Sequence, residues 1–279
     1  NCDSYSKRMI SPPTLAKRRC LMEELEIIDA SLDNVQNFSL CGYKNAKKEG
    51  YKEKLQWIKK NFDLGLRIKF LYSKEAGTQG MIEYMPSENS FRALKNVQNY
   101  YTIHCIFTGF KNEYKNKGYG SKLIESCFED AKSNNKTGVV AVARDSSFMA
   151  GKEIFLKNGF EIVDKSAPDF YLMVKKTGFS EDFPKFYDDL NKVNEDYKEG
   201  LYIFRSDQCP YTVKNVNEII DYAKNDLKIN VKVVNIDESS LITENPSPFG
   251  TFGIIYNGKI VSYHPISLTR FKNIAKSFE

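Results

Sequence analysis

The order of apolar and polar positions predicts two successive α/β units. In the first unit, residues 22–178, apolar and polar residues alternate as in a strand at 66–73. Residues 23–30 predict a first strand, and the β-rich, apolar residues 100–110 predict a central strand. A continuous apolar run, TGVVAVA at 137–143, is typical of a strand buried on both faces. A turn at GTQG leads into a further strand, MIEYM. The strands EIVDK and DFYLMVKK close the unit.

Segments in which apolar residues recur at helical spacing lie between these strands. Residues 46–62 form a basic amphipathic segment, and residues 147–158 predict a helix that Gly159 ends. A third helix follows a glycine-containing loop. Its predicted buried face consists of Leu123, Ile124, Cys127, Phe128 and Ala131.

The second unit, residues 201–279, is shorter. It begins with the strand LYIFRS, continues through a helix at 213–226 and the strand INVKVVNID, and then forms a hairpin around Asn257-Gly258. A closing helix follows, with Ser267 or Thr269 as its cap. Residues 179–200 are charged, and we expect them to be a helical linker between the units.

Charge excludes one class of function. The chain has 279 residues and a net charge of +5. Residues 1–21 hold five Lys or Arg residues against one Asp, so the rest of the chain carries only about +1. The body is therefore not expected to bind nucleic acid. Residues 1–21 lack the apolar core of a secretory signal, and we treat them as a leader or an expression-derived segment.

Cysteine and histidine content argues against a metal centre. Six cysteines form no CxxC pair, and the chain has only two histidines. We therefore expect no metal and free thiols, as in the reducing cytoplasm. The chain has no apolar run of the roughly 20 residues that a membrane helix needs, so we expect no membrane association.

A glycine loop between a buried strand and an amphipathic helix is the first candidate site. Its sequence is KNKGYGS, residues 115–121. Such a loop at a helix N-terminus offers free backbone N–H groups to an anion such as a phosphate. By itself the pattern is also that of an ordinary strand-to-helix turn.

The segment TGFKNEYKNKGYGSKLIE resembles the acetyl-CoA motif of the GNAT acetyltransferase family, Arg/Gln-x-x-Gly-x-Gly/Ala, with Lys115 at the Arg/Gln position. GVVAVARDSSFMAGKEIFLKNGFEIV is similar to the segment that follows in that family. The resemblance covers 23–178 and implies a mixed, splayed central sheet with acetyl-CoA as cosubstrate. It assigns coenzyme contacts to Thr108, Phe110, Lys115, Asn116, Lys117, Gly118, Tyr119, Gly120 and Ser121.

The same resemblance suggests catalytic groups. In members with a base on the central strand, the base precedes the motif by about eleven positions, which leads from Lys115 to His104. Strand alternation places His104 on one face with Ile106, and Cys105 with Phe107 on the other. His104 could instead be structural. Glu83 is a second candidate base, with an exposed strand carboxylate as the alternative.

The position of the family's usual acid is altered. Phe155 stands where many members carry a tyrosine as general acid, and phenylalanine cannot donate a proton. Tyr119 and Tyr84 are candidate substitutes that the sequence does not rank.

A second candidate site is Cys209-Pro210-Tyr211-Thr212, which resembles the active-site turn of thioredoxins and glutaredoxins. Thr212 stands in place of the second cysteine, so the motif allows only monothiol chemistry. A helix N-terminus is expected to lower the pKa of Cys209 and make it the most reactive thiol. The alternative is a cysteine that only packs.

Together, the two units resemble bacterial acetyltransferases with a YoaP-like C-terminal domain. The resemblance implies an α/β protein in which a GNAT unit, 22–178, precedes a small thioredoxin-like unit, 201–279. We expect a cytoplasmic, prokaryotic N-acetyltransferase that transfers acetyl groups from acetyl-CoA to a small-molecule or peptide amine by base-assisted direct attack. The alternative is a thiol-redox or sensing protein with a CoA-binding module and a thiol partner at Cys209.

Overall fold

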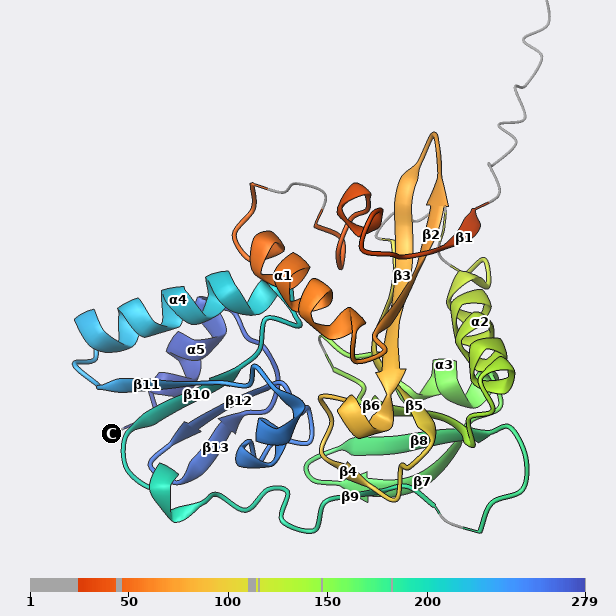
Figure 1. Ribbon diagram of the computed structural model, residues 1–279. Coiled ribbons are helices and arrows are strands. Elements are labelled where there is room, and N and C mark those ends of the chain that lie inside the picture. The colour runs from red at the N-terminus through yellow and green to blue at the C-terminus, as the bar shows by residue number, and fades with distance from the viewer. Residues whose placement is uncertain are drawn as a thin grey trace, which may run out of the picture.

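The computed structural model describes residues 25–43, 47–109, 114, 116–146, 148–181 and 183–278. Two α/β units lie side by side (Figure 1). The leader expected at 1–21 and two residues of the expected coenzyme contacts, Phe110 and Lys115, lie outside the described residues.

The first unit is built on a seven-stranded sheet of order β1-β2-β3-β5-β6-β8-β7. Every neighbouring pair is antiparallel except β5 and β6, which are parallel. The sheet is therefore mixed, as the resemblance implies. The strands are β1 Glu26–Asp29, β2 Arg67–Ser73, β3 Gly77–Pro86, β5 Tyr100–Thr108, β6 Gly138–Ala143, β7 Glu161–Ser166 and β8 Phe170–Lys176.

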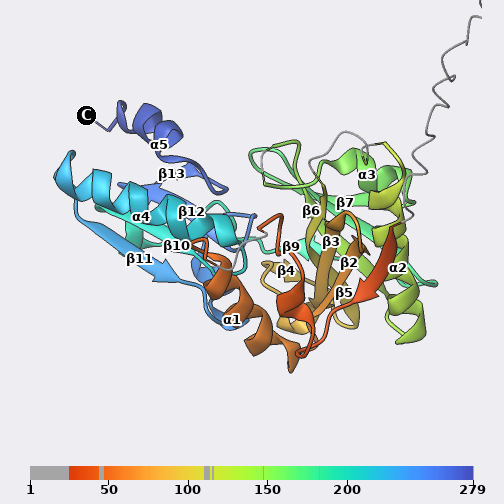
Figure 2. The same cartoon turned by 90° about the horizontal axis from the view of Figure 1, so that it is seen from above.

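Three helices cover the two faces of this sheet. Helix α1, Tyr51–Phe62, packs on the face that looks toward the second unit, while α2, Tyr119–Ser133, and α3, Lys152–Lys157, lie on the opposite face (Figures 1 and 2). The apolar face predicted for α2 is confirmed, because its buried residues are the five expected ones. Helix α3 is shorter than expected, and Gly159 ends it at a φ of 81°.

The second unit has a four-stranded sheet of order β11-β10-β12-β13. Strands β10 and β11 are parallel, and β12 is antiparallel to both β10 and β13. The order strand, helix, strand, hairpin and helix is the predicted one. Its elements are β10 Leu201–Arg205, α4 Pro210–Asn225, β11 Val231–Asn235, β12 Phe252–Tyr256, β13 Lys259–Ser262 and α5 Leu268–Ala275.

Residues between the units do not form the expected helical linker. Strand β9, Lys185–Phe186, pairs with β4, Leu94–Lys95, and a single 3-10 turn at Glu195–Tyr197 is the only helical element that the structure describes in this segment. Phe186 is buried, so the segment is attached to the first unit by both backbone pairing and apolar packing. Such tertiary contacts override a weak local preference for helix.

The two units share an apolar core. Trp57 of α1 and Phe91 pack in the same cluster as Phe204 of β10 and Ile255 of β12. The helix starts also meet: Gly50, the N-cap of α1, lies so close to the Pro210 carbonyl that a Cβ there would fall 1.9 Å from it. The second unit is therefore docked against the first and is not a separate body on a linker.

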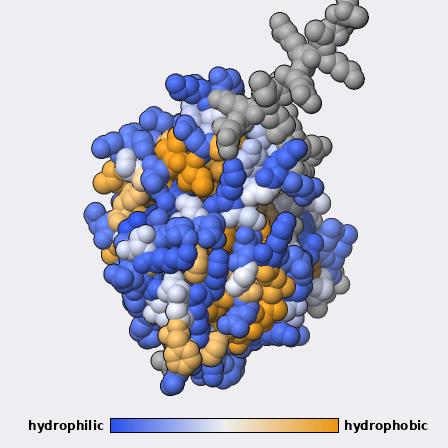
Figure 3. All heavy atoms as spheres, turned by 90° about the vertical axis from the view of Figure 1, so that its right-hand side faces the viewer, coloured by the Kyte–Doolittle hydropathy of each residue, from blue (hydrophilic) through white to orange (hydrophobic). Residues whose placement is uncertain are grey.

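The face of the molecule that carries α2 and α3 is mostly polar (Figure 3). On this face, apolar atoms gather in separate patches within polar surroundings (Figure 3). Among the residues that the structure describes, no helix has the length and apolar character required to cross a bilayer.

Candidate functional site

The central strands β5 and β6 part in the middle of the first sheet. Their ladder ends at the pair Ile103 and Ala141, although β5 continues to Thr108 against β3 and β6 continues to Ala143 against β8. The facing backbone edges beyond Ile103 therefore have no strand between them. Backbone groups in such a gap need other partners, so the opening is suited to an extended ligand with amide groups.

A bulge lies where the strands separate. Glu83 of β3 pairs with Cys105 and Tyr84 pairs with Ile103, so His104 is an extra residue on β5. The bulge changes the alternation of side chains. His104 contacts Trp57 and Phe91, on the α1 side of the sheet, where Cys105 also packs.

The prediction that His104 and Ile106 lie on the same face of β5 is therefore wrong. Ile106 packs in the cluster on the α2 side, whereas His104, Cys105 and Phe107 all face α1. The alternation argument assumed an unbroken strand, and the bulge inserts one residue into it.

His104 is a buried, neutral imidazole. Its Nε2 accepts the Phe91 N–H at 3.0 Å, which leaves the proton on Nδ1, 3.7 Å from Oε1 of Glu83. Burial lowers the pKa of His104 to about 4, with Arg92 and Lys54 adding to the effect and Glu83 opposing it. The lone pair that a general base would use is thus already occupied by a backbone amide.

Glu83 is a buried carboxylate that links the two units. It forms an ion pair with Lys54 of α1 and accepts a hydrogen bond from the Gln208 side chain at 2.9 Å. Burial favours the neutral acid, but the charge of Lys54 and the contact with His104 outweigh it and hold the pKa of Glu83 at about 2. Glu83 is therefore ionised and fully engaged, unlike the exposed carboxylate considered as the alternative.

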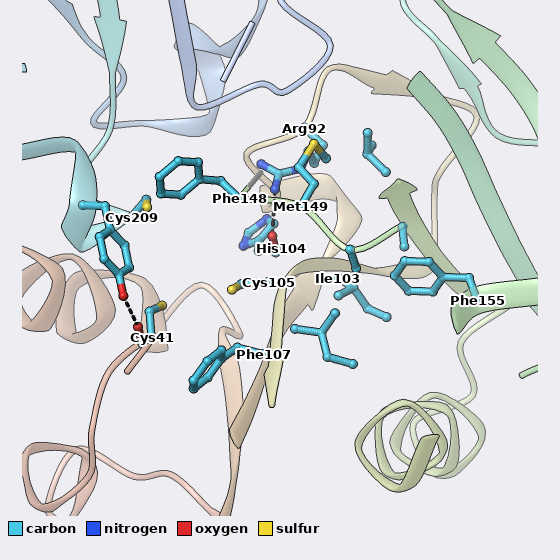
Figure 4. A pocket seen from close by; sticks show the side chains of 15 residues that line it. Cys41, Arg92, Ile103, His104, Cys105, Phe107, Phe148, Met149, Phe155 and Cys209 are labelled. Atoms are coloured by element: carbon cyan, nitrogen blue, oxygen red, sulfur yellow. Dashed lines mark hydrogen bonds between the residues drawn. The ribbon is translucent and has the colours of Figure 1, made fainter. Parts of the chain in front are cut away.

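A cavity of about 480 Å³ occupies the opening between β5 and β6 and extends to the second unit. Its volume lies in the range of roughly 300–1,000 Å³ that is usual for small-molecule sites. Residues of both units line it (Figure 4). They are Cys41, Arg92, Ile103, His104, Cys105, Ile106, Phe107, Ala141, Val142, Phe148, Met149, Ala150, Phe155, Cys209 and Tyr211.

The glycine loop opens α2 as expected. Gly118 is the helix N-cap at a φ of 78°, and a Cβ there would have open space around it. Gly120 has a different role, because a Cβ there would lie 2.6 Å from Cδ1 of Ile154 on α3. Gly118 thus leaves the helix N-terminus accessible, whereas Gly120 permits close packing of α2 against α3.

The remaining described loop residues are at or near the surface. Asn116 and Lys117 are exposed, and Tyr119 is half-buried. The Ser121 hydroxyl accepts a hydrogen bond from the Asn158 side chain at 3.0 Å. Thr108 ends β5 near Gly120. The strand edge and the helix N-terminus thus lie together, as the expected coenzyme contacts require.

Cys209 caps α4 but does not have the expected acidity. Burial, followed by the proximity of Cys41, raises the pKa of Cys209 to about 12. The expectation of a lowered pKa is wrong, because desolvation outweighs the favourable helix start. Thr212 turns back to the backbone, where its hydroxyl bonds to the carbonyls of Ser206 and Cys209.

Two further thiols face the same cavity. The Cys41 and Cys105 side chains are hydrogen-bonded, and this contact together with the charge of Lys54 lowers the pKa of Cys41 in spite of its burial. The same contact and burial raise the pKa of Cys105. Cys41, rather than Cys209, is thus the more acidic thiol of the cavity.

The structure distinguishes the candidate acids. Tyr84 donates its hydroxyl hydrogen to Asp130 on the α2 side, and burial raises its pKa. Tyr119 does not line the cavity. Tyr211 does, and burial raises its pKa to about 12; its hydroxyl donates to the Cys41 carbonyl at 3.1 Å. Phe155 is buried in the cavity wall.

Sequence reasoning missed three cavity residues whose side chains bear on the chemistry: Cys41, Arg92 and Phe148. It included Tyr211 in the candidate turn at Cys209 but assigned it no role. Arg92 lies in the stretch MIEYMPSENSFRAL, whose likeness to the YoaP-containing family was the only available signal. Phe148 has a φ of 66° and contacts Tyr211 and His264 of the second unit. Its placement depends on how the units dock, which local pattern does not encode.

Comparison with known proteins gives a relative along most of the chain. The curated "Uncharacterized N-acetyltransferase YoaP" of Bacillus subtilis (strain 168) is 24% identical over 253 residues, covering 88% of this chain and 97% of that protein. Residues 242–273, which span β12, β13 and most of α5, match the family model described as YoaP-like.

Solved acetyltransferases also align with part of the chain. The PaiA N-acetyltransferase from Thermoplasma acidophilum, in complex with coenzyme A, is 19% identical and covers 55% of this chain and 99% of its own, with a TM-score of 0.39. A GNAT-family acetyltransferase from Brucella melitensis, in complex with acetyl-CoA, is 11% identical and covers 59% and 96%, with a TM-score of 0.36. No cluster of three or more metal-ligating side chains occurs in the described part of the chain.

Proposed function

We propose that this protein is an acetyl-CoA-dependent N-acetyltransferase of the GNAT type. The observation that carries the proposal is the parting of β5 and β6 after Ile103 and Ala141, directly beside the open N-terminus of α2 at Gly118. The sequence relationship to a curated N-acetyltransferase over almost the whole of both chains supports it.

The residues present fit acetyl-CoA. The parted edge of β5, which ends at Thr108, would pair with the amide groups of the pantetheine arm. Backbone N–H groups from Lys117 to Ser121 would hold the pyrophosphate at the start of α2. The thioester would then lie in the cavity near His104, while Phe155 and Val142 exclude water from the apolar wall.

Transfer is direct in this proposal. The unprotonated amine attacks the thioester carbonyl, a C–N bond forms and the C–S bond breaks; the nitrogen then gives up one proton to water, and the departing thiolate takes up one proton. We infer that Tyr211, once released from the Cys41 carbonyl, supplies that proton to the departing thiolate and recovers one from water; its raised pKa keeps the phenol protonated at neutral pH. It would thus replace the tyrosine that is absent at Phe155.

We infer a positioning role for His104. To act as a base, it would first have to release the Phe91 N–H from Nε2. Its pKa of about 4 also makes it a weak base at neutral pH. Glu83, held ionised by Lys54, orients the Nδ1–H side of the imidazole. On this account, the acceptor loses its proton to water before attack.

The second unit supports the cavity in this proposal, with the order of a shortened thioredoxin-like fold. It contributes Cys209 and Tyr211 to the wall. A redox function for Cys209 is not favoured, because burial keeps this thiol protonated.

The experiment is an acceptor screen. The protein is incubated with acetyl-CoA and a panel of amines and thiols, and the free thiol of released CoA is followed beside mass spectrometry of the acceptor. Acetylated amine formed together with CoA supports the proposal. CoA release without an acylated amine, or no release with any acceptor, would contradict it.

A further inference from the structure

Arg92 is a buried cation without a carboxylate partner. The residue is only 5% exposed and lines the cavity (Figure 4). Its Nη1 donates to the Phe91 carbonyl at 3.0 Å and its Nη2 to the His104 carbonyl at 2.8 Å. Its Nε is buried without a hydrogen-bond partner, and no described carboxylate lies within ion-pair distance of the guanidinium.

The surrounding groups do not neutralise this charge. Glu83 is already paired with Lys54 and bonded to Gln208. The contact with Cys41, followed by burial, raises the pKa of Cys105, and burial raises the pKa of Cys209, so these two thiols stay neutral. Burial lowers the pKa of Arg92 only to about 10, which leaves the guanidinium charged at neutral pH. The guanidinium lies over the Phe249 ring, 5.5 Å from its centroid, which lowers the cost of burial but supplies no negative charge. A buried charge without a counterion costs free energy that an anionic ligand would offset.

The position of Arg92 limits the ligand further. The His104 carbonyl that Arg92 binds belongs to the residue directly after the last β5–β6 pair. A carboxylate on Arg92 would therefore lie beside the opening in which the thioester is proposed to react. The nucleophilic amine must then be separated from the carboxylate by very few bonds, as in an α-amino acid.

The cavity lining also includes large apolar side chains. Phe107, Phe148 and Met149 line the cavity, from β5 and from the segment after β6. Aromatic and thioether side chains of this kind accommodate apolar groups of varied shape. A guanidinium, in turn, binds a carboxylate through paired hydrogen bonds and not through charge alone.

We propose that Arg92 binds the carboxylate of the acceptor, and that the acceptor is a free α-amino acid with an apolar or aromatic side chain, acetylated on its α-amino group. This inference rests on the proposed acyl transfer and specifies its substrate class. Arg92 is then the residue that determines specificity, and Phe107, Phe148 and Met149 receive the acceptor's side chain.

The test compares matched acceptors that differ only in the carboxylate: phenylalanine, its primary amide and phenethylamine. For the wild-type protein we expect kcat/KM for the acid to exceed that for the amide by at least tenfold, because a charged hydrogen bond is lost with the amide. Equal rates for acid and amide would overturn the inference while leaving acyl transfer intact.

Variants separate recognition from structure. In Arg92→Gln the acid-to-amide ratio should fall toward one, and Arg92→Lys should retain part of the preference. Arg67→Gln, which removes a partly exposed arginine of β2 outside the cavity, should leave the ratio unchanged. A purely structural Arg92 would lower both rates equally and preserve the ratio, which would contradict the proposal.

A binding measurement that does not depend on turnover distinguishes carboxylate recognition by Arg92 from the proposed acetyl transfer. Calorimetry compares N-acetylphenylalanine with N-acetylphenylalaninamide on the wild-type protein and on Arg92→Gln. A preference for the acid that Arg92→Gln removes, without any transfer activity, would retain carboxylate recognition and reject the proposed function. No preference for the acid would reject carboxylate recognition, whatever the activity.

Discussion

Arg92 donates a hydrogen bond from Nη2 to the backbone carbonyl of His104, 2.8 Å away, at the point where β5 and β6 part. The imidazole of His104 accepts a hydrogen bond from the backbone N–H of Phe91, the residue before Arg92. The bulge in β5 and the 91–92 segment therefore hold each other in place. Together they set the position of the one buried guanidinium that lines the cavity among the described residues.

We predict that the N-cap of α2 controls CoA affinity. Gly118→Asp places a carboxylate beside the expected pyrophosphate and should weaken CoA binding at least tenfold in calorimetry, because like charges repel at the helix start. Gly118→Asn is the matched control, since both residues tolerate a φ of 78° and differ mainly in charge. Equal loss in both variants would assign the effect to backbone strain.

Gly120 is unsuited to this test. A side chain there meets Ile154 of α3, so Gly120→Glu would reduce packing and CoA affinity together.

His104→Gln should keep turnover within about tenfold of the wild-type value. The Gln side chain can still accept the Phe91 N–H but cannot act as a base near pH 7, and loss of a general base costs on the order of 10²–10⁴. His104→Leu removes the acceptor and should lower turnover much further. If Gln and Leu are equally impaired by a hundredfold or more, His104 is the base expected from the sequence.

Stability should fall as the pH drops below about 6.5, and His104 should account for much of the loss. Its pKa is about 4 in the folded protein and near 6.5 in the unfolded chain, so the unfolded state binds more protons in this interval. The effect amounts to about 2 kcal/mol between pH 6.5 and 5. His104→Gln should remove it in denaturant unfolding. Burial also lowers the pKa of His264, so His264→Gln should reduce the acid-linked loss, but by less than His104→Gln does.

Gly50→Ala should loosen the docking of the two units. Gly50 has a φ of 92°, and the new Cβ would collide with the Pro210 carbonyl. We expect a loss of more than about 2 kcal/mol in unfolding free energy. Gly77→Ala is the control: its φ is 68° with open space around the Cβ, so it reports backbone strain alone. Similar losses in both variants would mean that the Pro210 contact contributes little.

Among the cavity thiols, Cys41 should react fastest with iodoacetamide near pH 7. The Cys105 hydrogen bond and Lys54 lower its pKa, whereas burial raises that of Cys209 to about 12. Peptide-by-peptide alkylation rates measure this order directly. A faster Cys209 would restore the acidity expected from its position at a helix start.

Local pattern predicted most elements because each depends on residues close in sequence. One example is the set of five buried apolar positions of α2. Another is the hairpin whose turn residues, Asn257 and Gly258, adopt the left-handed backbone conformation. The capping site at Ser267 is another, since its side chain accepts the Arg270 N–H.

The candidate site depends on contacts that are distant in sequence. The bulge at His104 arises from the register between β3 and β5, so it cannot be predicted from the residues of β5 alone. The high pKa of Cys209 comes from burial against the first unit, which a helix-start argument omits. Arg92 becomes a candidate binding residue only because it is buried without a carboxylate partner, and the sequence alone does not show which residues surround it.

The most direct test of the central claim is the stoichiometry of a single turnover with acetyl-labelled acetyl-CoA and phenylalanine. The account predicts one labelled N-acetylphenylalanine for each CoA released, in the wild-type protein and in Gly118→Asn, with a much lower yield in Gly118→Asp. Label released as free acetate, or label retained on a cysteine of the protein, would contradict direct transfer to an amine.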